Sequence, residues 1–197
     1  MPPDILSTLR GYDPDVQKSR AEARQIMQKL GYGPDERLTV TVSTRNVPVY
    51  RDPAVILIDQ LKEVYIDAVL DIIPTVNWYP KLARKDYTVG LNINENSLDE
   101  PDQTFYESYV CGAERNYTGY CNPEIEKLME QQSVEPDAQK RRQLVGEIDV
   151  RLLADGARPP IMWARSTTCM HPHVKGFVNM VNSFYNGFRF EDVWLDR

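Results

Sequence analysis

The sequence lacks the segments that would place a chain in a membrane or direct its export. No apolar run among its 197 residues approaches the roughly 20 residues that cross a bilayer. The first twenty residues include Pro, Asp and Arg and hold no apolar signal core. A basic face is also missing, because the formal net charge is −6 and both signs are scattered along the chain. This argues against nucleic acid as a main partner, since phosphate binding needs a basic surface.

Recognisable enzyme motifs are missing too. The sequence holds no G-x-S-x-G elbow, no phosphate-binding loop, no dinucleotide-binding glycine fingerprint and no H-E-x-x-H zinc motif. The composition, 42% apolar and 26% charged, is that of an ordinary globular protein long enough for one domain with a core. We therefore expect neither catalysis nor a cofactor.

What is present is an alternation of strands and helices, which predicts an α/β fold. The β-branched runs Leu38–Val42 and Val69–Ile73 read as strands, and a helix from about Pro53 to Val64 lies between them with Val55 on its inner face. A strand–helix–strand unit of these lengths predicts parallel strands joined by a right-handed crossover. Tyr87–Ile93 reads as a third strand.

Further elements are expected on both sides of this unit. Helices are predicted after Asp13 and near Pro101, Pro123 and Pro136, and late strands at Ile161–Ala164 and Val174–Val178.

The loops that leave the first three strands are the predicted ligand site. These loops, 43–51, 74–78 and 94–99, should gather at the carboxyl edge of the sheet, where open α/β sheets bind ligands. Their hydrogen-bonding and aromatic side chains suit a polar small molecule. The candidate ligand-binding residues are Arg45, Asn46, Tyr50, Asn77, Trp78, Asn94, Asn96, Ser97 and Asp99.

Two clusters offer metal or acid–base chemistry as the alternative. Asp99, Glu100 and Asp102 could form a catalytic pair or a cation site, which would suit a metal-assisted hydrolase. Pro101 lies among them, however, and acidic residues at a helix N-terminus need no ligand. We therefore favour the structural interpretation.

Cys169, His171 and His173 alternate, and on a strand they would share one face as a soft-metal trio. Pro172 interrupts the run and no fourth ligand is evident. The favoured interpretation is a buried cysteine beside two surface histidines, with no metal.

Cys111 and Cys121 flank a short polar loop that contains Gly112 and Gly119, a layout suited to a local disulfide. A metal pair is the weaker interpretation, because no other Cys or His lies nearby in the sequence.

The most informative stretch runs from this loop into a helix start, with Asn122 as N-cap and Pro123 at the first helical position. Its pattern, N-Y-x-G-Y-x-N-P-E…L, resembles the C-terminal half of family 5 extracellular solute-binding proteins, the peptide and nickel receptors of ABC importers. Four further pieces follow the family's order along almost the whole chain. They are Gly11–Asp15 with the later Leu30–Gly33, Tyr50–Val55, Val174–Phe177 and Phe190–Asp196.

The resemblance implies a three-layer lobe with a periplasmic-binding-protein-like fold and a mixed, partly parallel sheet over residues 1–176. Residues 177–197 would be a tail that returns toward the first lobe of the receptor. The resemblance implies that this chain is a fragment that includes neither that first lobe nor the signal peptide. The implied function is binding of a small polar or peptide-like solute in the periplasm, with an ABC-importer membrane permease as partner. Some dipeptide-binding relatives carry a cysteine pair in the matching loop, which favours a periplasmic Cys111–Cys121 disulfide.

One departure from the family pattern bears on selectivity. In the peptide-binding members the third strand runs into a G-W-x-x-D segment, whose Asp pairs with the free amino group of the peptide. Counting from Tyr87 and from Pro101 puts Asn94 at the Trp position and Ser97 at the Asp position. A serine has no negative charge and cannot supply the bond that makes a carboxylate favour an ammonium group. The implied solute is therefore a blocked or cyclic peptide, a sugar-like molecule or another neutral polyol-amide, unless Asp99 or Glu95 takes the place of the missing carboxylate.

A third class, a protein-interaction module without a ligand, would rest on exposed apolar surface. The tail is too apolar to be left in water, so we expect it to fold back on the lobe or to pack against another copy of the chain. Its apolar residues include Phe184, Tyr185, Phe188, Phe190, Val193, Trp194 and Leu195.

Overall fold

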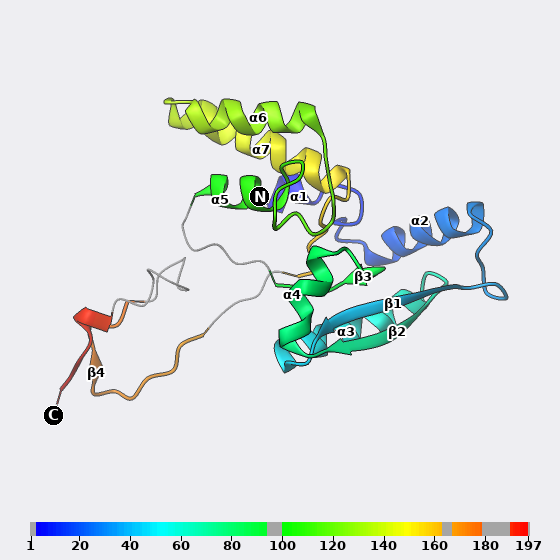
Figure 1. Ribbon diagram of the computed structural model, residues 1–197, viewed down its shortest axis with the longest axis horizontal. Coiled ribbons are helices and arrows are strands. Elements are labelled where there is room, and N and C mark those ends of the chain that lie inside the picture. The colour runs from blue at the N-terminus through cyan, green and yellow to red at the C-terminus, as the bar shows by residue number, and fades with distance from the viewer. Residues whose placement is uncertain (1–2, 94–99, 163–166, 179–189, 197) are drawn as a thin grey trace.

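The computed structural model describes residues 3–93, 100–162, 167–178 and 190–196 (Figure 1). Figure 1 shows a sheet with helix α3 beside it, a separate group of helices α5, α6 and α7, and strand β4 apart from both. Among the described residues no helix is both long and apolar enough to cross a membrane. The elements are α1 (Pro3–Leu6), α2 (Val16–Lys29), β1 (Leu38–Arg45), α3 (Pro48–Lys62), β2 (Ile66–Ile73), α4 (Thr75–Ala83), β3 (Val89–Gly90), α5 (Pro101–Ser108), α6 (Pro123–Val134), α7 (Ala138–Ala154), β4 (Val174–Lys175), the 3-10 helix η1 (Phe190–Asp192) and β5 (Trp194–Leu195).

The sheet has the strand order β2-β1-β3, and both described pairings are parallel. The register between β1 and β2 runs from Leu38 opposite Ile66 to Arg45 opposite Ile73. Val42, Ser43 and Thr44 are consecutive and all buried. A strand buried on both faces is typical of a parallel sheet covered on two sides. The predicted α/β class and the parallel strand–helix–strand unit are confirmed.

The boundaries around α3 differ from the prediction. Strand β1 continues through Arg45 and α3 begins at Pro48, so the expected loop 43–51 shrinks to Asn46 and Val47. Pro48 occupies the first turn, where a proline costs no helical hydrogen bond, and Pro53 lies inside the helix. As α3 packs on the sheet, Ala54 is buried and Val55 is 51% exposed. The prediction that Val55 lies on the inner face was wrong.

The predicted loop 74–78 was also wrong, because those residues from Thr75 onward belong to α4. Helix α4 points Trp78 and Leu82 inward, and both are buried. Strand β3 covers only Val89–Gly90 of the predicted third strand, and Ile161–Met162 form no strand.

The helices α5, α6 and α7 enclose their own apolar core. Their starts follow the capping rules: the side chain of Asn122 accepts from the backbone N–H groups of Glu124 and Ile125, with Pro123 next in the helix. The Asn122–Pro123 helix start predicted from the sequence is therefore confirmed. The core residues are Phe105, Ile125, Met129, Ile148, Leu152 and Ala157.

Strands β4 and β5 pair antiparallel and form a second small sheet. Gly176 has φ +77°, and a Cβ there would lie 1.9 Å from the carbonyl oxygen of Asp192, so only glycine fits. Phe190 and Trp194 remain 63% and 56% exposed. The tail boundary at residue 177 and self-association through the tail stay predictions.

Candidate functional site

Arg45 is the last residue of β1 and lies at the carboxyl edge of the sheet. Its Nη1 donates a hydrogen bond of 2.9 Å to the hydroxyl oxygen of Tyr50 on α3. The guanidinium also lies over two aromatic rings, 4.7 Å from the ring centroid of Tyr50 and 5.6 Å from that of Tyr79. Both distances are within the range of a cation–π interaction. Two aromatic rings therefore hold the guanidinium in place.

The Nε of Arg45 is buried and has no hydrogen-bond partner among the described residues. A buried donor left in this state costs about 1–3 kcal/mol, more when the group is charged. Guanidinium donors are best satisfied by carboxylate or other oxygen acceptors. Arg45 therefore has hydrogen-bonding capacity that the described part of the fold does not use.

The aromatic contacts continue beyond Arg45. The rings of Tyr79 and Tyr117 lie 6.5 Å apart between centroids, with 45° between their planes. Tyr117 belongs to the loop between α5 and α6, and its carbonyl oxygen accepts a bond of 2.8 Å from the hydroxyl of Tyr87. Arg45, Tyr50, Tyr79 and Tyr117 together are named the Arg45 cluster below.

The structure brings together only part of the predicted ligand site. Arg45 and Tyr50 are in contact, and the backbone N–H of the exposed Asn46 is bonded to the carbonyl of Ile73 at the same edge. Asn77 is exposed on α4. The remaining polar candidates, Asn94, Asn96, Ser97 and Asp99, lie outside the described residues.

Trp78 does not lie in a mouth loop as predicted. Trp78 is part of α4 and its side chain is fully buried, and its Nε1 donates a hydrogen bond of 3.2 Å to Oδ1 of Asn92. A buried indole with a satisfied N–H is a core aromatic in this lobe.

Tyr79 and Tyr117 were missed from the sequence. Tyr79 follows Trp78 directly, and only the helical register of α4 shows that the two rings point in different directions: Trp78 is buried, whereas Tyr79 is 43% exposed. The contact between Tyr79 and Tyr117 joins segments that are distant in the chain, and no local pattern predicts it.

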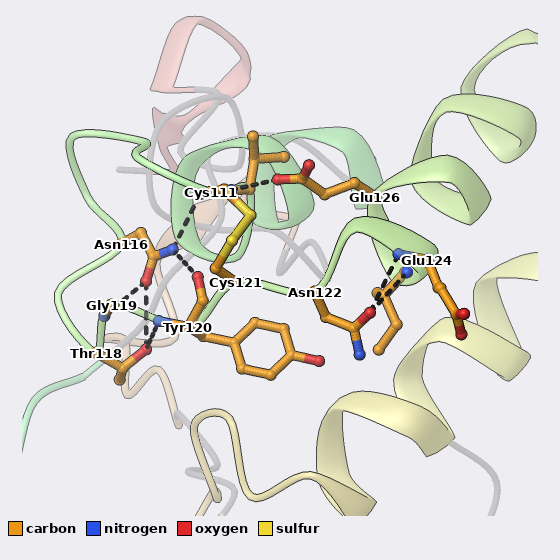
Figure 2. The surroundings of a disulfide bond; sticks show 11 residues. Cys111, Asn116, Thr118, Gly119, Tyr120, Cys121, Asn122, Glu124 and Glu126 are labelled. Carbon is orange, nitrogen blue, oxygen red and sulfur yellow. Dashed lines mark hydrogen bonds between the residues drawn. A yellow bond between two sulfur atoms is a disulfide. The ribbon is translucent and has the colours of Figure 1, made fainter.

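The loop 111–121 is closed by the Cys111–Cys121 disulfide, with 4.6 Å between the two Cα atoms (Figure 2). The pairing that the family resemblance implied is present. Inside the loop, the Asn116 side chain is 2% exposed and acts as a hub. Its Nδ2 donates to the carbonyls of Val110 at 2.9 Å and Tyr120 at 2.6 Å. Its Oδ1 accepts from the N–H of Gly119 at 3.0 Å.

Two side chains tie this loop to the helices. The backbone N–H of Cys111 donates to Oε1 of Glu126 on α6 (Figure 2). The hydroxyl of Tyr120 donates to Oδ2 of Asp155, after the end of α7, at 2.5 Å. Burial, followed by this bond to a carboxylate, raises the pKa of Tyr120 to about 12. Tyr120 is therefore a neutral donor throughout the physiological range.

The acidic cluster is part of the helix packing. Glu100 caps α5 by accepting from the N–H of Asp102 at 3.4 Å, and its two carboxylate oxygens bond Arg141 of α7. Asp102 accepts from the hydroxyl of Ser133 on α6 at 2.7 Å. For these two residues the helix N-terminus interpretation is confirmed, and Asp99 lies outside the described residues.

The Cys169, His171 and His173 segment differs from the expectation in one respect. Cys169 is exposed, so the prediction that it is buried was wrong. The two histidines are on the surface as expected, and their rings stack with centroids 5.2 Å apart. The segment is not a strand up to Val174, which removes the alternation that would have aligned the three side chains. Within the described ranges no three such side chains are placed to hold a metal ion.

Two surface hollows lie away from the Arg45 cluster. One, of about 810 Å³, runs along α7 beside Ile5, and the other, of about 440 Å³, lies on α3 around Ile56. Both are open, and neither includes a predicted ligand-binding residue. Arg45 lies over two aromatic rings, and its Nε has no partner within the described part of the chain, so it is the better candidate for a ligand site.

Comparison with known proteins identifies the class of fold to which this structure belongs. No family model and no curated protein matches the chain. Among solved structures, OppA of Burkholderia pseudomallei matches with a TM-score of 0.79 at 15% identity, over 95% of this chain and 37% of that one. OppA of Haemophilus influenzae, in complex with RPPGFSPFR, matches with 0.79 at 16% identity, over 97% and 39%. The periplasmic binding protein DppA of Helicobacter pylori, in complex with the peptide STSA, matches with 0.77 at 16% identity, over 98% and 36%.

At these identities the likeness shows the fold, which is that of a periplasmic-binding-protein-like lobe. Within that class, the matching structures are receptors of the kind that the sequence motifs resemble, so the expected likeness to family 5 solute-binding proteins is confirmed at the level of fold. The chain spans 36% to 39% of the length of these three structures.

Proposed function

We propose that this chain is the C-terminal, ligand-facing lobe of an ABC-importer receptor that binds a small polar or peptide-like solute in the periplasm. The observation that carries the proposal is the Arg45 cluster, which lies at the carboxyl edge of a parallel sheet. Ligands of open α/β sheets bind at that edge. The matching structures with RPPGFSPFR and with the peptide STSA support the substrate class.

The chemistry of the cluster suits a solute with an oxygen acceptor. Arg45 has a buried Nε that can donate, and its charge strengthens a hydrogen bond to a carboxylate or an amide carbonyl. Tyr79 is 43% exposed and can offer ring surface to the apolar part of the same solute. A few fixed polar groups beside aromatic surface are the usual composition of a small-molecule site.

Capture of the solute requires a second surface. Receptors of this architecture close two lobes about a hinge, and closure removes the ligand from water. Because the chain spans 36% to 39% of the matching structures, the second surface would come from the rest of the receptor. The closed form would then be presented to the membrane permease.

The second part of the proposal concerns selectivity. With Ser97 at the position of the amine-binding Asp, the site has no carboxylate there to favour an ammonium group. Unless Asp99 or Glu95 supplies the carboxylate instead, the solute is then a blocked or cyclic peptide, a sugar-like molecule or another neutral polyol-amide, held by Arg45 together with Asn94, Asn96 and Ser97.

The hydrolase alternative has less support. Glu100 and Asp102 would have to supply its carboxylates, and both are bonded to Arg141 or to Ser133 across the helix packing. Their oxygen atoms serve the fold rather than a metal ion or a water nucleophile.

Thermal-shift screening of the full-length receptor against N-acetylated dipeptides and polyol-amides tests the proposal. We expect at least one compound to raise the melting temperature, and the Arg45→Met variant to lose that shift. Arg51→Met is the matched control, because Arg51 is an exposed arginine on α3 paired only with its neighbour Asp52 in the described contacts. A compound that stabilises wild type and Arg45→Met equally would contradict the role of Arg45.

A further inference from the structure

We propose that Tyr117 is a positioning residue for Arg45, and that the disulfide-closed loop 111–121 exists in this lobe to hold Tyr117 in place. The effect on ligand affinity rests on the proposed function. The effect on Arg45 itself does not, and it can be measured without a ligand.

The contact path is short. Tyr117 packs on Tyr79 with ring centroids 6.5 Å apart, and the guanidinium of Arg45 lies 5.6 Å from the centroid of Tyr79. Tyr79 is 43% exposed, so the ring has room to change rotamer when nothing packs on its outer side. Tyr117 supplies that packing.

Two hydrogen bonds fix the backbone of Tyr117, one from outside the loop and one within it. Its carbonyl accepts from the hydroxyl of Tyr87, and its N–H donates to the carbonyl of Arg115 at 2.8 Å. Its neighbour Asn116 fixes the loop through the carbonyls of Val110 and Tyr120 (Figure 2). Apart from the bond from Tyr87, these contacts lie between the two disulfide-bonded cysteines or directly beside them.

Gly119 permits the tight return of this loop. It has φ +73°, a conformation that a side chain disfavours, and a Cβ there would meet the side chain of Lys85 at 3.0 Å. The disulfide, the Asn116 hub and Gly119 thus leave Tyr117 few alternative positions.

The consequence for binding is preorganisation. An arginine already held between two rings loses less side-chain freedom when a ligand accepts its hydrogen bonds. Removing the Tyr117 ring frees Tyr79 and then Arg45, while the buried core is unchanged. An aromatic pair at this separation contributes about 0.5–1.5 kcal/mol, so we expect affinity to fall about two- to tenfold.

The first test follows the Nε–H signal of Arg45 by ¹⁵N NMR in the 197-residue chain. The Arg45→Lys variant assigns the signal, since it alone removes it. We expect Tyr117→Leu to shift the Arg45 signal and to speed its exchange with water. Tyr117→Phe keeps the ring and should retain the wild-type signal. Tyr106→Leu, which removes an exposed tyrosine of α5, is the matched control and should leave the signal unchanged.

The loop is tested by the double variant Cys111→Ser, Cys121→Ser, which should move the Arg45 signal in the same direction as Tyr117→Leu. The backbone amide spectrum of the α6–α7 core reports whether each variant is folded. An Arg45 signal that is identical in wild type and in folded Tyr117→Leu would overturn the proposal.

The second test measures the affinity of the full-length receptor for N-acetyl-alanyl-alanine by calorimetry. We expect Tyr117→Leu to bind about two- to tenfold more weakly, and Tyr117→Phe and Tyr106→Leu to bind as wild type does. If wild type binds neither this probe nor any other acetylated dipeptide, the proposed function fails, and the NMR comparison still decides the role of Tyr117. Equal affinity of wild type and Tyr117→Leu would refute the coupling.

Discussion

Ser43 and Asp71 face each other across β1 and β2, and the hydroxyl of Ser43 donates a hydrogen bond of 2.9 Å to Oδ2 of Asp71. Ser43 is 1% exposed, and Lys81 of α4 lies 3.8 Å from the same carboxylate oxygen. A buried hydroxyl in the central strand is thus satisfied by a carboxylate that also attracts α4. The pair joins the sheet to the helix that carries Tyr79.

This relationship predicts an asymmetry between two substitutions. Ser43→Ala removes the donor and should lower the free energy of unfolding by about 1 kcal/mol. Asp71→Leu leaves the buried Ser43 hydroxyl without its acceptor and should cost more, about 1–3 kcal/mol. Urea denaturation measures both, with Asp52→Asn on the exposed side of α3 as control. An equal loss in the two variants would contradict the predicted asymmetry.

Trp78 should behave as a core residue. Because its side chain is fully buried, we expect Trp78→Phe to remove the blue-shifted part of the tryptophan emission. Trp194→Phe should remove red-shifted emission instead, because Trp194 is 56% exposed. Trp78→Ala should lower the free energy of unfolding by about 3–5 kcal/mol. Red-shifted emission from Trp78 would return it to the set of solvent-facing ligand candidates.

The helix starts and the parallel unit could be predicted because they depend on local rules. Asn122 followed by Pro123 specifies a cap and a first turn, and the β-branched run at Leu38 specifies a strand. The start of α3 could not be settled in this way, since Pro48 and Pro53 are both acceptable near a helix N-terminus. Only packing of the helix on β1 and β2 selects between the two starts.

The candidate site was predicted less completely, for a physical reason. Arg45 and Tyr50 are close in sequence and lie at one strand end, so the sheet rule finds both. The orientation of Trp78 and Tyr79 depends on whether residues 74–78 form a loop or a helix. The contact of Tyr79 with Tyr117 depends on how the disulfide loop packs against α4, which no short motif encodes.

The Cys111–Cys121 bond should contribute measurably to stability. It closes a loop with a sequence separation of 10, for which chain entropy predicts about 3 kcal/mol at most. We expect urea denaturation of the Cys111→Ser, Cys121→Ser double variant to give a free energy of unfolding lower than that of wild type by up to that amount. Cys169→Ser, which changes the exposed free cysteine, should have almost no effect. Mass analysis showing two free thiols at positions 111 and 121 after expression without reductant would contradict the bond.

Asp149 predicts a pH dependence of stability. Burial raises the pKa of its carboxyl above the ordinary value, so the folded state disfavours the charged form. The stability linked to this group is fully present below the unfolded pKa and is lost as the pH rises through the raised folded pKa. Asp149→Asn should therefore be more stable than wild type at about pH 7, and this advantage should disappear toward about pH 4.

Urea midpoints at the two pH values measure this difference. Asp59→Asn, which changes an exposed carboxylate on α3, should show no comparable change between them. A stability gap between wild type and Asp149→Asn that is the same at both pH values would refute the assignment.

The most direct test of the central claim is calorimetric titration of the full-length receptor with alanyl-alanine and with N-acetyl-alanyl-alanine. The two ligands share the carboxylate that Arg45 would bind and differ in the free amine, to which Ser97 offers no carboxylate. The account predicts that the acetylated ligand binds at least as tightly as the free one, and that Arg45→Met weakens both. Tight binding of the free dipeptide that is lost on acetylation, or binding that is unaffected by Arg45→Met, would contradict it.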